Sequence, residues 1–177
     1  IIVSGNGSLT VNAKGKSGIV SDDYVNITGG NVTVNSTAST LVSNGDTTKV
    51  AGIKGKDNFI MTDGTLTISC SGTGAKGISG DGTAEFNGGT VNITVTGNNF
   101  GSSSGGWWPG GHGGNQSDNS VAAKGIKFDG NITFNSGCNV IVKCSKHEAI
   151  ESKGELTVNG GHIYAYSAAD DAINSAS

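Results

Sequence analysis

The chain has 177 residues, of which 31 are glycine, one is proline and 14% are charged. The formal net charge is −3, and every basic side chain other than histidine is a lysine, since the sequence contains no arginine. This charge balance excludes the basic surface typical of nucleic-acid-binding proteins, and no apolar run approaches the ~18 residues that a membrane span needs. We therefore expect neither a nucleic-acid partner nor membrane insertion.

A short phrase built on Gly-Ile or Ala-Ile recurs along the chain and marks the predicted elements in order. Its six copies contain the following isoleucines: Ile19, Ile53, Ile78, Ile126, Ile150 and Ile173. Their spacings are 34, 25, 48, 24 and 23 residues, which gives a basic period of about 24 with two insertions. A period of this length, with alternating β-branched residues and no helical pattern, predicts a parallel β-helix.

Alternating segments follow the first five phrases, and each is broken by a turn that contains glycine. They cover residues 24–35, 58–69, 83–96, 131–142 and 155–167. Superposing them predicts a second inward column of Ile27, Met61, Phe86, Phe134 and Val158, and a third of Val34, Ile68, Ile93, Val142 and Ala165. A polar row of Thr28, Thr62, Asn87, Asn135 and Asn159, with Asn12, is predicted to hydrogen-bond from coil to coil.

The predicted fold is all-β: residues 1–177 form one domain, a single-stranded right-handed parallel β-helix (solenoid) of about six to seven coils. The handedness follows from the general rule for parallel crossovers. Two loop insertions are expected at about residues 37–49 and 98–123. The chain opens in an apparent strand and stops just after a coil begins, so we expect a fragment or mature part of a longer chain. The open ends of such a stack favour end-to-end self-association.

Three cysteines are predicted to be unpaired. Cys70 and Cys144 fall in one inward column, two coils and so near 10 Å apart. That separation exceeds what a disulfide tolerates. Cys138 falls at a turn and has no partner in the superposition.

The longer insertion contains both tryptophans, Trp107 and Trp108, set among glycines. A loop of this length inside a regular solenoid is typically functional or disordered. Exposed indoles can stack on sugar rings, which makes the pair a candidate substrate-binding element. The alternatives are a cover over a groove or a contact between molecules.

Acidic side chains gather around the last two phrases. Glu148 and Glu151 flank one isoleucine, and Asp170, Asp171 and Asn174 flank the next. Stacking of successive coils puts Glu148 beside Asp171 and Glu151 beside Asn174. Oxygen ligands in this number suit Ca²⁺. The alternative is a solvated acidic edge or another cation.

Lysines occupy the same phrases in earlier coils, namely Lys54, Lys76, Lys124 and Lys127. A lysine strip beside a calcium site would suit the carboxylates of a uronic acid chain, so these four residues are candidate substrate-binding residues. Ordinary surface ion pairs with Asp22, Asp81 and Asp129 explain the pattern equally well.

The last sixth of the chain resembles a known family. Glu148-Ala149-Ile150-Glu151, then Leu156 to Gly161, then Asp170 to Asn174 are similar to the E-G-I-E, T-I-N-G-G and D-D-G-I-N motifs of the bacterial carbohydrate-binding domain family. The match is close over residues 148–175; elsewhere only the strand rhythm is shared. Members of that family resemble pectate-lyase-like β-helices, bind Ca²⁺, and attach to cellulose or polygalacturonate without clear catalysis. The resemblance implies calcium at Glu148, Glu151, Asp170, Asp171 and Asn174, although Ala149 and Ala172 stand where the family has glycine.

The sequence thus predicts a secreted or cell-surface bacterial protein that binds cell-wall polysaccharide, uronate-containing or cellulosic, with calcium as cofactor and no catalytic residues. The first alternative is a self-assembling extracellular fibre, matrix or adhesin subunit. The second is a calcium-dependent pectate lyase with Lys124 or Lys127 as base, because the lack of arginine excludes arginine-based lyases.

Overall fold

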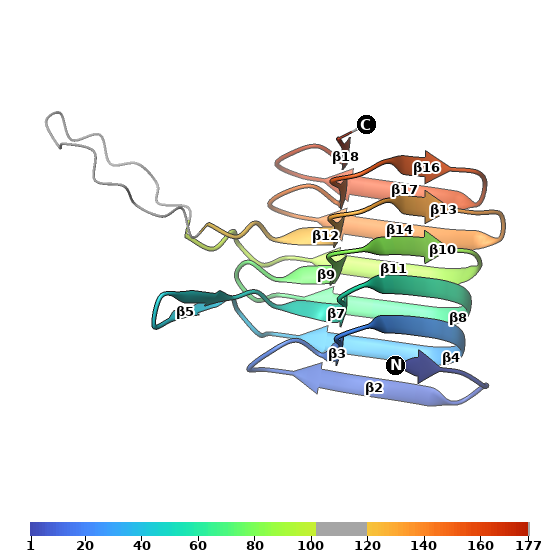
Figure 1. Cartoon of the computed structure of the whole chain (residues 1–177), viewed down its shortest axis with the longest axis horizontal. Coiled ribbons are helices and arrows are strands. Elements are labelled where there is room, and N and C mark those ends of the chain that lie inside the picture. The colour runs from blue at the N-terminus through green and yellow to red at the C-terminus, as the bar shows by residue number, and fades with distance from the viewer. Residues whose placement is uncertain (102–119, 177) are drawn as a thin grey trace, which may run out of the picture.

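The computed structural model describes residues 1–101 and 120–176, and all regular structure in these residues is β-strand (Figure 1). The strands form a ten-stranded sheet, a six-stranded sheet and a separate two-stranded hairpin, and all pairing within the two larger sheets is parallel. Among the described residues, no helix has the length and apolar character needed to cross a membrane.

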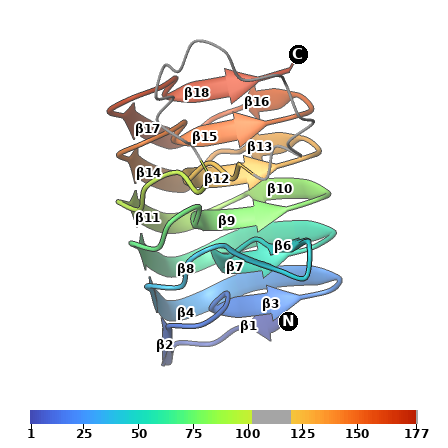
Figure 2. The ribbon, with the colours of Figure 1, turned by 90° about the vertical axis from the view of Figure 1, so that its left-hand side faces the viewer.

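The six-stranded sheet contains the recurring isoleucine phrase. Its strands are β3 (Ile19–Ser21), β7 (Ala51–Gly55), β9 (Lys76–Gly80), β12 (Lys124–Phe128), β15 (Ile150–Ser152) and β18 (Ile173–Ser175). Figure 2 shows these strands stacked in chain order. All six isoleucines pair in register from strand to strand, as the superposition predicts. We call one passage of the chain through both sheets a rung.

The ten-stranded sheet contains the alternating segments. Its strands are β1 (Ile2–Val3), β2 (Ser8–Ala13), β4 (Tyr24–Ser36), β8 (Asn58–Cys70), β10 (Thr83–Phe86), β11 (Gly89–Val95), β13 (Ile132–Phe134), β14 (Cys138–Cys144), β16 (Leu156–Val158) and β17 (His162–Ser167). Glycines with positive φ, such as Gly30 at 81° and Gly64 at 91°, bend the chain where other residues would be strained. Strand β8 therefore pairs with β10 before its bend and with β11 after it, which curls the sheet.

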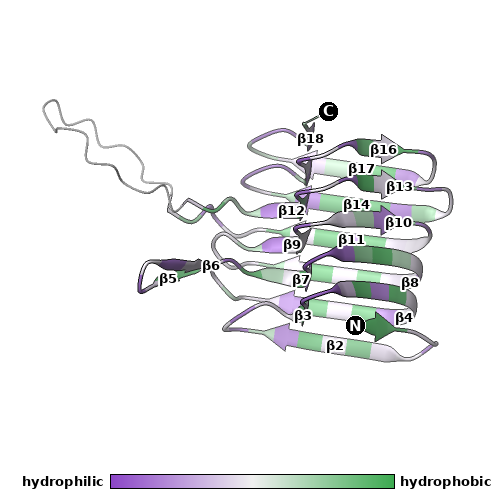
Figure 3. Ribbon diagram, in the orientation of Figure 1, coloured by the Kyte–Doolittle hydropathy of each residue, from purple (hydrophilic) through white to green (hydrophobic). Residues whose placement is uncertain are grey.

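The core lies between the sheets and contains the predicted inward columns except at the last rung. The inward placement of Val158 and Ile173 is wrong, since they are 54% and 44% exposed on β16 and β18, the terminal strands of the two sheets in the described residues. Met61, Phe86 and Phe134 align in register, as do Ile68, Ile93 and Val142. The rings of Phe86 and Phe134 stack with centroids 5.0 Å apart. Figure 3 shows the alternation of apolar and polar residues along the long strands. Each rung thus buries side chains that it could not cover alone.

Glycine precedes the isoleucine because the third column leaves no room for a side chain. A Cβ at Gly77 would lie 2.5 Å from Ile93 Cγ2 and 2.5 Å from the carbonyl oxygen of Gly125. In the rung where Ala149 replaces glycine, the third column contains Ala165 in place of a β-branched residue. The larger residue at position 149 is therefore accompanied by a smaller residue, Ala165, in the column that it packs against.

The polar row is confirmed for its last three members, because Asn135 Nδ2 donates to Asn87 Oδ1 at 2.6 Å and Asn159 Nδ2 donates to Asn135 Oδ1 at 2.9 Å. The placement of Asn12 in this row is wrong. Strand β2 pairs with the part of β4 after its bend, so Asn12 lies opposite Asn35 and accepts a hydrogen bond from it.

The first predicted insertion contains a hairpin of β5 (Leu41–Ser43) and β6 (Asp46–Thr48), which projects from the stack in Figure 1. Its turn uses Asn44 and Gly45, both with positive φ, as a tight hairpin turn requires. In the second insertion, an antiparallel bridge joins Phe100 to Val121. Trp107 and Trp108 lie outside the described residues.

The all-β, parallel architecture predicted from the repeat is confirmed, and the isoleucine sheet marks six rungs in the described part of the chain. The right-handed sense and the single-solenoid description stay predictions. All three cysteines are free, as expected, and all three are buried.

Candidate functional site

Two rows of side chains on the six-stranded sheet bring the predicted lysines and acids together. Lys76 and Lys124 are register partners in one row. The other row runs through Lys54, Ser79, Lys127, Glu151 and Asn174. The second row therefore changes from basic to acidic between β12 and β15, and Glu148 lies two residues before Ile150 as Lys124 lies two residues before its register partner Ile126.

The basic half of these rows lines an open cavity of about 330 Å³, at the small end of the range for ligand pockets. Its basic side chains are Lys49, Lys76, Lys124, Lys127 and Lys153, and its wall includes residues 120–122, His147 and Glu151. A smaller adjoining cavity shares three of these lysines and adds Lys54, Asp81 and Asp129. We call the set Lys49, Lys54, Lys76, Lys124 and Lys127 the lysine pocket.

Positive charge in the lysine pocket is only partly neutralised. Lys127 forms an ion pair with Asp129. Lys76 Nζ donates to the carbonyl oxygen of Ala122 at 3.3 Å. In the described part of the chain, no carboxylate lies within 4.0 Å of the ammonium groups of Lys49, Lys54 or Lys76. The pocket thus concentrates cationic groups on a protein whose net charge is −3.

The burial of Lys76 and the neighbouring ammonium groups affect its pKa. Burial lowers its pKa from the usual 10.5 to about 8, and the charges of Lys49, Lys127 and Lys124 act in the same direction. Glu151 opposes the change without cancelling it. An anion in the cavity would relieve this repulsion.

Lys124 joins the basic half to the acidic half. Its Nζ lies 3.1 Å from Glu148 Oε2 and 2.5 Å from Glu151 Oε2, and both glutamates are buried, with 4% and 2% of their surface exposed. Glu151 Oε1 also forms an ion pair with Lys153 Nζ at 2.6 Å. Burial raises the pKa of Glu151, but the hydrogen bonds and charges of the two lysines outweigh it, so the net pKa is below its usual value. Glu151 is therefore held as a carboxylate by ammonium groups.

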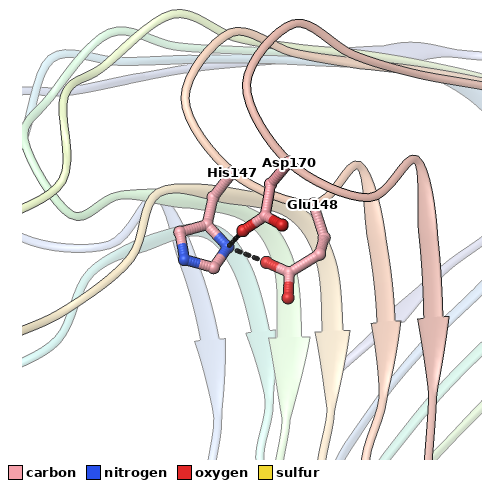
Figure 4. A group of neighbouring side chains, drawn as sticks. All are labelled: His147, Glu148 and Asp170. Carbon is pink, nitrogen blue, oxygen red and sulfur yellow. Dashed lines mark ion pairs between the residues drawn. The ribbon is translucent and has the colours of Figure 1, made fainter.

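The acidic half contains a cluster of His147, Glu148 and Asp170, whose side chains point toward one another in Figure 4. His147 Nδ1 contacts Glu148 Oε2 and lies 3.1 Å from Asp170 Oδ2. One potential ligand atom from each residue lies within 4.8 Å of the others. Burial lowers the pKa of His147, and Lys124 lowers it further, against the pull of Asp170 and Glu151.

This cluster has features of a cation site. Glu148 Oε2 is buried and receives no hydrogen bond of normal geometry from residues 1–101 or 120–176, although Lys124 Nζ is near it. Asn174 Nδ2 donates to Glu148 Oε1 at 3.4 Å, so its amide lies at the same corner. Carboxylate and amide oxygens are hard ligands suited to Ca²⁺, and the imidazole nitrogen adds a softer donor.

The five predicted calcium ligands do not all converge. Glu148 and Asp170 lie beside His147, and Asn174 contacts Glu148, whereas Glu151 lies between Lys124 and Lys153. Asp171 is exposed, and its backbone N–H donates to Asp170 Oδ1 at 2.9 Å, while its carboxylate is outside the cluster.

The four predicted lysines all line the pocket, and the structure adds three residues that sequence reasoning missed. Lys49 follows the hairpin of the first insertion, outside the repeated phrase, so the superposition gave no signal for it. Lys153 lies two residues beyond Glu151. His147 directly precedes Glu148, and this adjacency was the available signal.

The stacked parallel sheets, with a cationic cavity beside a carboxylate cluster, are consistent with a binding protein for an extended polar ligand. A family model described as "carbohydrate-binding domain-containing protein" matches residues 1–172, so this chain belongs to that family. Searches of curated proteins and of solved structures found no significant match. Family membership supports a carbohydrate partner and suggests a non-catalytic role.

Proposed function

We propose that this protein binds an acidic cell-wall polysaccharide, one that contains uronates, through the lysine pocket and without catalysis. The observation that carries the proposal is the positive charge of that pocket, which the described residues neutralise only in part, in a member of a carbohydrate-binding family. The positive charge of the pocket alone would suit any anion. Membership of a carbohydrate-binding family favours an anion that is an acidic sugar.

The chemistry favours a uronate over cellulose. A carboxylate accepts charge-assisted hydrogen bonds from ammonium groups, which are stronger than bonds between neutral groups. It would also offset the repulsion that, in addition to burial, lowers the pKa of Lys76. A neutral glucan supplies hydroxyls, which leave the repulsion in place.

Calcium remains part of the proposal, at the corner of His147, Glu148 and Asp170. Glu148, Asp170 and Asn174 would supply oxygen atoms, and the ion would neutralise the carboxylates. Lys124 belongs to both sites, since it lines the cavity and contacts Glu148. A cation at Glu148 would repel the Lys124 ammonium, which would then be available to a bound uronate.

We also propose where the protein is located and how its rungs are wound. Cell-wall polysaccharides lie outside the membrane, so we propose a secreted or cell-surface bacterial protein. We take the stacked rungs as a single right-handed β-helix, in line with the general handedness of parallel crossovers.

Calorimetry tests the proposal. Oligogalacturonate and cello-oligosaccharide are titrated into the protein, with and without Ca²⁺. We expect saturable heat with oligogalacturonate, weaker in Lys76→Gln and Lys127→Gln and unchanged in Lys16→Gln, an exposed lysine outside the pocket. Equal affinity for the neutral oligosaccharide, or an equal loss in Lys16→Gln, would contradict it.

The same samples test the two alternatives. A fibre subunit predicts large or filamentous particles by light scattering and no sugar heat. A lyase predicts unsaturated uronate products. For that chemistry Lys76 is the better base, because its pKa is lowered to about 8, whereas Lys124 and Lys127 are ion-paired.

A further inference from the structure

A second surface with sugar-binding chemistry lies on the ten-stranded sheet. Tyr164 and Tyr166 of β17 are 47% and 49% exposed, and the residues that alternate with them, Ile163 and Ala165, pack against the core. Because the tyrosines are two residues apart in a strand, they lie on the same outward side, about 7 Å apart.

The neighbouring strands extend this surface. Ile141 of β14 is the register partner of Tyr164, and Lys143 is the partner of Tyr166. Asn92 and Thr94 of β11 continue the two rows. Figure 1 shows β11, β14 and β17 side by side on one face of the stack.

Charge on this surface has one sign. The outward positions of the three strands contain no carboxylate; they are Thr90, Asn92, Thr94, Asn139, Ile141, Lys143, His162, Tyr164 and Tyr166. Lys143 is exposed beside the tyrosine pair. An anionic chain with apolar patches complements such a surface, since aromatic rings meet the patches and the ammonium meets a carboxylate.

We infer that Tyr164 and Tyr166 form a second carbohydrate contact, on which the apolar faces of pyranose rings of an acidic polysaccharide stack, with Lys143 beside a uronate carboxylate. This inference rests on the proposed function and extends it to a surface distinct from the lysine pocket, which belongs to the six-stranded sheet. Tyrosine suits the role because it offers an apolar ring and a hydroxyl at its edge. The same two rows contain only threonine, asparagine and serine in the rungs of β4 and β8, so the aromatic contact is confined to the last rungs.

The test uses the double variant Tyr164→Ala/Tyr166→Ala, titrated with oligogalacturonate by calorimetry. We expect wild type to show two classes of site, and the affinity of the second class to fall about tenfold or more in this variant while the lysine-pocket site is retained. Tyr164→Phe/Tyr166→Phe keeps the rings and should bind within about threefold of wild type. Tyr24→Ala is the matched control, because Tyr24 is 42% exposed but lies on β4, away from the pair. Thermal melting verifies that each variant is folded.

Unchanged affinity in the double alanine variant would overturn the inference, as would an equal loss in Tyr24→Ala. The proposed function would survive either result, provided that wild type binds and Lys76→Gln weakens binding. Absence of any wild-type binding would overturn both.

Discussion

Replacing Lys76 by methionine should stabilise the protein at neutral pH, although it removes a residue that we place in the binding pocket. Burial and neighbouring ammonium groups lower the Lys76 pKa from 10.5 to about 8. At about 1.4 kcal/mol per tenfold change in proton affinity, this difference corresponds to about 3 kcal/mol. Methionine also forfeits the hydrogen bond to Ala122, worth about 1 kcal/mol. The expected net gain is about 2 kcal/mol.

The pH dependence gives a second readout of the same effect. Between about pH 8 and 10.5, the unfolded chain retains the Lys76 proton that the folded protein has released. Wild-type stability should therefore rise across this interval, by about 3 kcal/mol, relative to Lys76→Met. Urea unfolding at a series of pH values measures both curves at constant ionic strength. A variant less stable than wild type at pH 7, or parallel pH curves, would refute the reasoning.

Three further predictions follow from the contacts of the site and core. Lys124→Met leaves the two buried glutamates without their shared partner, so unfolding should show a loss of about 3–5 kcal/mol. Lys153→Met, at an exposed side chain, should cost less than about 1 kcal/mol, and equal losses would contradict this contrast. Gly77→Ala should cost about 1–3 kcal/mol by overpacking, whereas Gly15→Ala, with nothing within 4 Å, should be nearly neutral in the same assay. Finally, because Lys124 belongs to both sites, Ca²⁺ and oligogalacturonate should raise each other's affinity by the same factor in calorimetry. Independent binding of the two ligands would argue against the shared role.

The register of the core was predictable because side-chain alternation and stacking fix it together. A one-residue slip would turn Phe86 or Ile93 away from the core, so few alignments are compatible with the pattern. Asn12 was misplaced because the first rung is irregular: β1 pairs with the start of β4 and β2 with its end. The sequence of β2 does not indicate which half of β4 it pairs with.

The site was predictable in its location and only partly in its contacts. Stacking brought the acids of the last two phrases to one corner, because backbone register determines which residues are neighbours. It paired Glu148 with Asp171, however, whereas the structure brings Asp170 to Glu148. The ion pairs of Lys124 with Glu148 and Glu151 depend on how a long side chain reaches across rungs, which register does not specify. A signal was nevertheless present, since Lys124 and Lys127 occupy the same phrase positions as Glu148 and Glu151 one rung later.

The most direct test of the central claim is a crystal structure of the protein with a bound oligogalacturonate. We predict a uronate carboxylate in the cavity lined by Lys49, Lys76 and Lys127, within hydrogen-bonding distance of Lys76 Nζ. A sugar bound elsewhere, with the lysine pocket free of carboxylate, would contradict it.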